Sequence, residues 1–167
     1  SKTFYFVDKG TQRGSTYDLF RLFEEDLNER LAKEQKLKQK HLKVRVVFIP
    51  VARSDLLPAL AAGKGDIAAS NLTITAEREK LIDFSAPVVT NVSELVVSGP
   101  ASPAVSSVDD LAGQEVFVRK SSSYYESLVA LNQRLAAENR PGVSTKEAPE
   151  TLEDEDLIEM VNAGLIP

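Results

Sequence analysis

Segments typical of strands alternate with segments typical of helices along this chain, and that order constrains the fold more than any other feature. The β-branched run KVRVVFIPV, residues 43–51, predicts a strand with a buried centre. Before it, apolar residues recur at helical spacing from Tyr17 to about Lys40 and predict a long helix. Such alternation is typical of an α/β sheet that carries helices on its faces. We therefore predict the α/β class.

The same patterns recur over the rest of the chain. Further strands are expected at residues 3–8, 66–70, 93–100, 115–120 and 165–167. Each further helix is expected to begin at a capping hydroxyl, and the capping residues are Ser54, Thr75, Ser107, Ser123 and Thr151. Capping-box spacing adds Asp110 after Ser107 and Glu126 after Ser123.

A stretch rich in proline, serine and alanine, ASPAVSS at residues 101–107, divides the chain. Strand and helix patterns start again after it. We therefore predict a first lobe at residues 1–98, followed by a hinge and a second lobe at residues 99–167. With 167 residues, the chain is long enough for one ordinary domain or two small lobes.

Composition argues against several classes of function. A net charge of −5 does not suit nonspecific nucleic-acid binding, and the basic run from Lys33 to Lys43 is interpreted as a solvated helix end. The chain has no cysteine, which excludes disulfides and zinc–thiolate sites. The single histidine, His41, argues against a histidine-based metal site or triad. No apolar run approaches the roughly 20 residues that span a bilayer.

The turn SNLTIT joins the expected strand at residues 66–70 to the next helix, and its composition suits a ligand. In open α/β sheets, ligands bind beyond the carboxyl ends of strands, near helix N-termini. Ser70, Asn71 and Thr73 offer hydrogen-bonding side chains at this place. Arg78 falls in the first helical turn, where a cation is disfavoured by about 0.3–1 kcal/mol. A negative partner for Arg78 is therefore expected.

Two kinds of partner for Arg78 fit this pattern. A guanidinium with neutral donors and acceptors beside it matches the geometry of a ligand carboxylate. Alternatively, Arg78 pairs locally with Glu77, Glu79 or Asp83, an interaction worth at most about 1 kcal/mol on a surface. The spacing alone leaves both alternatives open.

The turn RKSSS, residues 119–123, is a second candidate for ligand contact. It combines Arg119 and Lys120 with three serines at an expected helix start. Unpaired amides at a helix N-terminus bind anions readily. Ser122 and Ser123 are therefore candidate ligand contacts, although Ser123 also suits a simple helix cap.

No catalytic or metal-binding residue is assigned. The acidic cluster from Glu153 to Asp156 lies at an expected helix start, where the dipole stabilises negative charge, and we interpret it in that way rather than as a metal site. The sequence shows no nucleophile–base pair, no G-x-S-x-G motif and no phosphate-binding loop. We expect a segment without catalytic activity, metal or cofactor.

The segment GKGDIAASNLTITAEREKLIDFSAP resembles the signature of type 2 periplasmic solute-binding proteins of family 3, the amino-acid-binding branch. The shared pattern is a Gly-x-x-Asp strand, a turn ending in Thr-x-x-x-x-Arg, and Asp-Phe-Ser-x-Pro. It is matched by Gly63, Asp66, Thr73, Arg78, Asp83, Phe84, Ser85 and Pro87. GSTYDLF and SVDDLAGQEVFVRKSSSYYESL resemble the regions that open the family's first helix and second lobe, so the likeness runs almost end to end.

This resemblance implies a fold like that of type 2 periplasmic-binding proteins, with two lobes and a truncated second lobe. It also implies that Arg78 grips the α-carboxylate of a ligand. Thr73, together with Ser70 or Asn71, would supply neutral hydrogen bonds to the same group.

The second lobe would close on the ligand through Ser123 and its neighbour Ser122. By the same resemblance, Arg119 takes a position that often carries a cation lining the cleft. Arg53 stands roughly where the family often places a stacking aromatic residue. This departure shifts the expected ligand toward polar or larger molecules.

Three segments resemble most the amino-terminal module of membrane-bound lytic transglycosylase F-type proteins: YFVDKGTQRG, HLKVRVVFIPV and APETLEDEDLIEMVNAGLIP. In those proteins, this module precedes a separate muramidase-like domain. This implies a sensor of an amino acid or peptide-like carboxylate in the periplasm or cell envelope that regulates an attached lytic domain. The alternatives are a periplasmic receptor that delivers solute to the membrane permease of an ABC transporter, and a dehydratase-like enzyme on the same fold.

Overall fold

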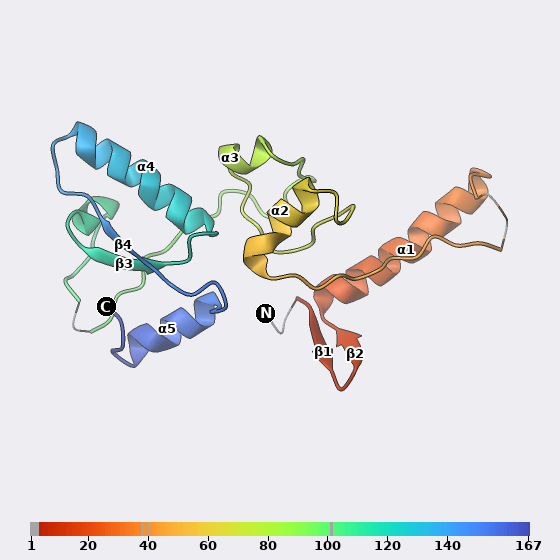
Figure 1. The fold of residues 1–167 in the computed structure, drawn as a ribbon, viewed down its shortest axis with the longest axis horizontal. Helices are drawn as coiled ribbons and strands as arrows, with labels where there is room; N and C mark the ends of the chain where they lie inside the picture. Colours follow the sequence, from red (N-terminus) through yellow and green to blue (C-terminus); the bar gives the residue numbers. More distant parts are fainter. Residues whose placement is uncertain (1–3, 38, 40, 101) are drawn as a thin grey trace. The chain divides into compact units, whose positions relative to one another are not determined.

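The computed structural model describes residues 4–37, 39, 41–100 and 102–167, which form a mixed α/β chain (Figure 1). Its helices are α1 (Ser15–Lys33), α2 (Leu56–Ala61), α3 (Ala76–Glu79), α4 (Ser123–Ala137) and α5 (Asp154–Asn162). Its strands are β1 (Phe6–Asp8), β2 (Thr11–Arg13), β3 (Glu115–Val118) and β4 (Ser144–Glu147). Two short 3-10 turns lie at Arg53–Asp55 and Val108–Leu111.

The chain divides into two compact units. The first unit contains Ser1–Val51 and Gly63–Leu72, and the second contains Ala52–Ala62 and Thr73–Pro167. The predicted lobes at residues 1–98 and 99–167 stay a prediction, and Ala101 of the predicted hinge lies outside the described residues.

The first unit begins with a hairpin that leads into α1. β1 pairs antiparallel with β2, so that Phe6 lies opposite Arg13. Lys9 and Gly10 form the hairpin tip, and both have left-handed backbone, with φ of +47° and +82°. α1 ends at Lys33, earlier than predicted, and Lys38 and Lys40 of the predicted helix lie outside the described residues.

The predicted strand at residues 43–51 is wrong: this segment is extended but joins no sheet, and Val47 is 77% exposed. The segment runs alongside α1 (Figure 1) because α1 side chains take its backbone hydrogen bonds. The Asn28 amide donates to the Val44 carbonyl at 2.9 Å and accepts from the Val44 N–H at 2.8 Å. Glu24 Oε2 accepts from the Val46 N–H at 2.7 Å. These contacts replace part of the ladder that a partner strand would supply.

Three more predicted strands are not formed. Residues 66–70, 93–100 and 165–167 pair with no strand among the described residues, and Leu95 is 84% exposed. A β-branched or apolar run becomes a strand only where a neighbour supplies ladder hydrogen bonds. The sequence reading also missed β4, whose residues STKE are polar and largely exposed.

The second unit is built around the parallel pair β3–β4, with Val116 opposite Thr145. α4 connects the two strands (Figure 1), and its buried leucines pack with Val118 of β3 and with Val143 next to β4. The buried core of this unit comprises Leu111, Val118, Leu128, Leu131, Leu135 and Val143. Parallel strands need a crossover connection of this kind, which here is the helix that the sequence predicted.

Two predicted caps are confirmed and two are displaced. Thr75 Oγ1 accepts from the Arg78 N–H at 3.3 Å, and Ser107 forms its capping box with Asp110. α4 is capped by Ser122 rather than by Ser123, because the Ser122 hydroxyl accepts from the Tyr125 N–H.

α5 is capped by Glu153 and not by Thr151, since Glu153 forms a capping box with Asp156. This confirms that the acidic cluster opens a helix. Ser54 lies within the 3-10 turn before α2 and does not cap that helix.

Candidate functional site

Arg78 is a buried guanidinium held by three acceptors of the second unit. Its residue surface is 6% exposed. Nε donates to Glu126 Oε1 at 2.9 Å, one terminal nitrogen donates to the Thr73 carbonyl at 3.1 Å, and the other donates to the Ser121 carbonyl at 3.1 Å. The negative partner that the sequence called for is therefore Glu126, which lies on α4.

The local alternative for Arg78 is not what the structure adopts. The carboxylate of Glu77 instead accepts from Lys80 Nζ at 2.5 Å on the exposed side of α3. Arg78 is instead buried and meets the start of α4 through Ser121 and Glu126. A second contact joins the same two segments, since the Ser123 hydroxyl at the start of α4 donates to Thr73 Oγ1 at 3.3 Å.

Glu126 is a residue whose role the sequence reading missed. Its spacing from Ser123 predicted a capping box within α4, but its carboxylate reaches Arg78 instead. The Glu126 side chain is 31% exposed, so the pair lies at the edge of the buried region. The signal was the unexplained cation in the first turn of α3, which required a carboxylate from elsewhere in the chain.

The second predicted turn is engaged by the segment that leads into α5. Arg119 is 3% exposed, donates to the Leu152 carbonyl at 3.0 Å and forms an ion pair with Asp154. Glu153 Oε2 lies 3.9 Å from the same guanidinium. Arg119 therefore fastens the start of α5 to the end of β3, and its ligand contact stays a prediction.

The serines of this turn have distinct partners. Ser121 donates its N–H to Glu150 Oε1 at 3.0 Å and its hydroxyl to Glu150 Oε2 at 2.5 Å. The Ser122 hydroxyl donates to the Arg119 carbonyl at 2.6 Å while it caps α4. The Glu150 carboxylate therefore holds the residue just before the α4 cap, and ligand contact by Ser122 or Ser123 stays a prediction.

The remaining predicted contacts are placed as follows. Ser70 and Asn71 lie in the first unit and are exposed, and the Ser70 carbonyl accepts from the Leu72 N–H at 2.9 Å. Arg53 is half-buried at the start of the 3-10 turn that precedes α2, in the second unit. Their roles toward a ligand stay predictions.

Tyr124 adds a titratable group beside the second turn. Burial raises the pKa of its hydroxyl, and the carboxylates of Asp154 and Glu94 raise it further. The phenol is protonated at neutral pH with or without this shift, and it can donate a hydrogen bond.

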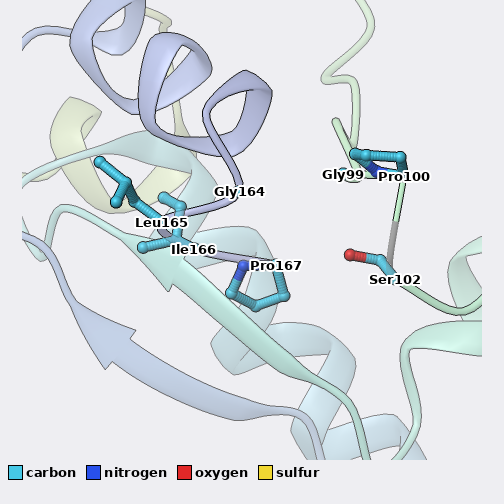
Figure 2. Close-up of a pocket in the computed structure, with 7 residues that line it drawn as sticks. All are labelled: Gly99, Pro100, Ser102, Gly164, Leu165, Ile166 and Pro167. Carbon is cyan, nitrogen blue, oxygen red and sulfur yellow. The ribbon is translucent and has the colours of Figure 1, made fainter.

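The second unit also contains a pocket (Figure 2). Its volume is about 250 Å³, and it is lined by Gly99, Pro100, Ser102, Gly164, Leu165, Ile166 and Pro167. The Ser102 hydroxyl oxygen is buried and has no hydrogen-bond partner among the described residues. None of the predicted ligand contacts lines this pocket.

In the described part of the chain, no three or more histidine, aspartate or glutamate side chains are grouped so that they could share a metal ion. No helix in the same residues combines the length and apolar character needed to cross a membrane.

Comparison with known proteins identifies the class. The family model for bacterial extracellular solute-binding proteins, family 3, matches residues 2–166. The chain belongs to this family, as the sequence resemblance predicted. Membership implies a binding module with a type 2 periplasmic-binding-protein fold, and a periplasmic or envelope setting.

Two of the relatives that match this chain are membrane-bound lytic murein transglycosylases F. A membrane-bound lytic murein transglycosylase F from Maricaulis maris is 36% identical over 103 residues, which are 60% of this chain and 22% of that protein. The transglycosylase F of Methylobacillus flagellatus is 27% identical over 164 residues, 98% of this chain and 31% of that protein. The chain thus spans less than a third of the length of these two relatives.

A second kind of relative binds a named solute. The L-cystine-binding protein TcyJ of Escherichia coli K12 is 30% identical over 89 residues, which are 53% of this chain and 34% of that protein. The chain is therefore similar both to transglycosylase F proteins and to an amino-acid-binding protein.

Proposed function

We propose that this chain is a non-catalytic sensor module of the bacterial cell envelope that binds an amino acid or small peptide-like molecule through its carboxylate. The observation that carries the proposal is the 2.9 Å contact between Arg78 Nε and the Glu126 carboxylate at a largely buried position. A guanidinium that is shielded from water and already holds a carboxylate is suited to hold that of a ligand. Membership of solute-binding family 3 and the similarity to TcyJ support the same class of ligand.

In this proposal, Arg78 provides the charged contact and hydroxyl groups complete the site. Thr73 and Ser123, already in contact, would offer neutral hydrogen bonds to the ligand. Ser122, Arg119, Arg53, Ser70 and Asn71 are proposed to contribute polar contacts to a ligand. Two lobes at residues 1–98 and 99–167 would close around the ligand by bending near residues 98–105.

We further propose that ligand binding regulates a lytic transglycosylase domain attached to this module. The support is the similarity to two transglycosylase F proteins of which the chain matches only a part. Binding would bias the module toward its closed state and thereby change the conformation presented to the attached domain. The similarity to TcyJ favours a second candidate function, a receptor that delivers an amino acid to a membrane permease.

Calorimetric titration of the full-length gene product tests the binding proposal. The probes are L-cystine, the common L-amino acids and muropeptides, added to the wild type and to the Arg78→Ala variant. We expect at least one probe to bind the wild type, and Arg78→Ala to weaken it by about tenfold to a hundredfold, since a charge-assisted hydrogen bond is lost.

The matched control is Arg134→Ala. This removes an arginine of the second unit whose ion pair with Asp109 is exposed. Its affinity should equal that of the wild type. Equal affinity of Arg78→Ala and the wild type would remove Arg78 from the binding site.

A further inference from the structure

We infer that Glu126 is a built-in competitor of the ligand: its carboxylate occupies Arg78 in the free protein, and a ligand carboxylate has to displace it. The inference rests on the proposed function of Arg78. It adds a residue that sets the affinity without contacting the bound ligand.

The contacts of Arg78 divide into fixed and releasable ones. The Thr73 and Ser121 carbonyls belong to the backbone of two turns, so they leave the guanidinium only if those turns move. Glu126 reaches Arg78 by its side chain alone. Rotation about side-chain bonds can therefore release the Glu126 carboxylate while both backbone contacts remain.

Exposure points in the same direction. The Arg78 side chain is 7% exposed, whereas that of Glu126 is 31% exposed. A carboxylate at the edge of a buried region can turn into water and regain its hydration there. The buried guanidinium has no such alternative and requires an anion in place of the one that leaves.

Charge makes the two carboxylates exclusive. One guanidinium neutralises one carboxylate, and a second carboxylate at the same place is opposed by like-charge repulsion. The apparent affinity for a ligand is then reduced by the fraction of molecules in which Arg78 is already paired. If the pair is open in about one molecule in ten, the affinity is about tenfold weaker than the site could provide.

The test compares Glu126→Ala and Glu126→Gln with the wild type by calorimetric titration of L-cystine and the common L-amino acids into the full-length protein. We expect Glu126→Ala to bind about tenfold more tightly than the wild type. Glu126→Gln keeps the size of the side chain without its charge and should bind more tightly as well. Circular dichroism verifies that each variant is folded.

Glu77→Gln is the matched control. It removes the same charge next to Arg78 on α3, but Glu77 contacts Lys80 and not Arg78. If removal of any negative charge near Arg78 strengthened ligand binding, Glu77→Gln would bind more tightly too. We expect its affinity to equal that of the wild type.

The outcomes separate the two proposals. If the wild type binds a probe and the two Glu126 variants bind it equally well or more weakly, Glu126 does not compete, and weaker binding would instead show that it holds the ligand. If Arg78→Ala binds as the wild type does, the site itself is misplaced. If no probe binds the wild type, Arg78→Ala or either Glu126 variant, both proposals are overturned.

Discussion

Glu150 binds Ser121 through both of its carboxylate oxygens, one accepting the backbone N–H at 3.0 Å and the other accepting the hydroxyl at 2.5 Å. The two residues lie 29 positions apart in the sequence. This pair ties the loop after β4 to the turn that opens α4. The loop is therefore part of the folded second unit and not a loose connection.

Removing this carboxylate should destabilise the second unit. Glu150→Ala leaves the Ser121 N–H and hydroxyl without their acceptor, so we expect the free energy of unfolding to fall by about 1–3 kcal/mol. Urea denaturation monitored by circular dichroism measures the change. Glu159→Ala, at an exposed position of α5, is the control and should stay within about 0.5 kcal/mol of the wild type. A loss no greater than that of Glu159→Ala would show that the Ser121 contact is energetically neutral.

Arg119 should be among the most sensitive charged residues of the second unit. Arg119→Ala leaves the Leu152 carbonyl without its donor, and it leaves Asp154, whose side chain is 44% exposed, without its cation, so we expect a loss of about 1–3 kcal/mol. Thermal unfolding compares it with Arg134→Ala, which breaks an exposed ion pair and should cost at most about 1 kcal/mol. Similar midpoints for the two variants would contradict the anchoring role of Arg119.

Glu24 should make the stability of the first unit depend on acid pH. The hydrogen bond from the Val46 N–H lowers the pKa of Glu24 below its ordinary value of 4.5, and the guanidinium groups of Arg45 and Arg21 lower it further. Because the folded pKa lies below the unfolded one, the stabilisation is present above pH 4.5 and is lost as the pH falls through the folded pKa.

Unfolding of the wild type and of Glu24→Gln, measured from pH 7 to pH 2, checks this dependence. We expect the difference in stability between the two proteins to be largest at neutral pH and to shrink in acid. A difference that grows on acidification would mean that the charged form of Glu24 is disfavoured in the folded protein.

Gly14 should tolerate no side chain. Its φ is +118°, and an added Cβ would lie 2.3 Å from the Phe4 carbonyl oxygen, which is backbone and cannot yield. Gly14→Ala should therefore cost more than about 3 kcal/mol, combining a clash with a backbone region open almost only to glycine. Gly10→Ala is the comparison, since its φ is also positive but nothing lies within 4 Å, and we expect about 1–2 kcal/mol. Thermal unfolding that ranks the two variants equally would be incompatible with the close approach of Phe4.

Local rules predicted the parts of the fold that depend on neighbours in sequence. The cap at Thr75, the capping box of Ser107 and the presence of a helix at α4 are all set within a few residues, and each was found. The segment at residues 43–51 failed because its backbone partners, Asn28 and Glu24, are polar side chains of a helix far back in the chain. Nothing in the β-branched run itself distinguishes such partners from a neighbouring strand.

The candidate site shows the same division. That Arg78 requires a negative partner followed from its place in the first turn of α3. The identity of that partner could not be predicted, because Glu126 lies 48 positions away in the sequence and fits a local capping pattern equally well. The family could be assigned from the spacing of residues 63–87, whereas the ion pair between Arg78 and Glu126 is seen only in the structure.

Because α3 is short, the contacts of Arg78 also stabilise the helical turn that carries it. Four residues are far fewer than the roughly 12–15 that an isolated helix needs to persist in water, so this turn is ordered by what its arginine grips. Exchange of one carboxylate for another passes through a moment when only the Thr73 and Ser121 carbonyls hold Arg78, and the turn is then least stable. The folding and unfolding of this one helical turn would then signal the exchange of carboxylates to the rest of the second unit.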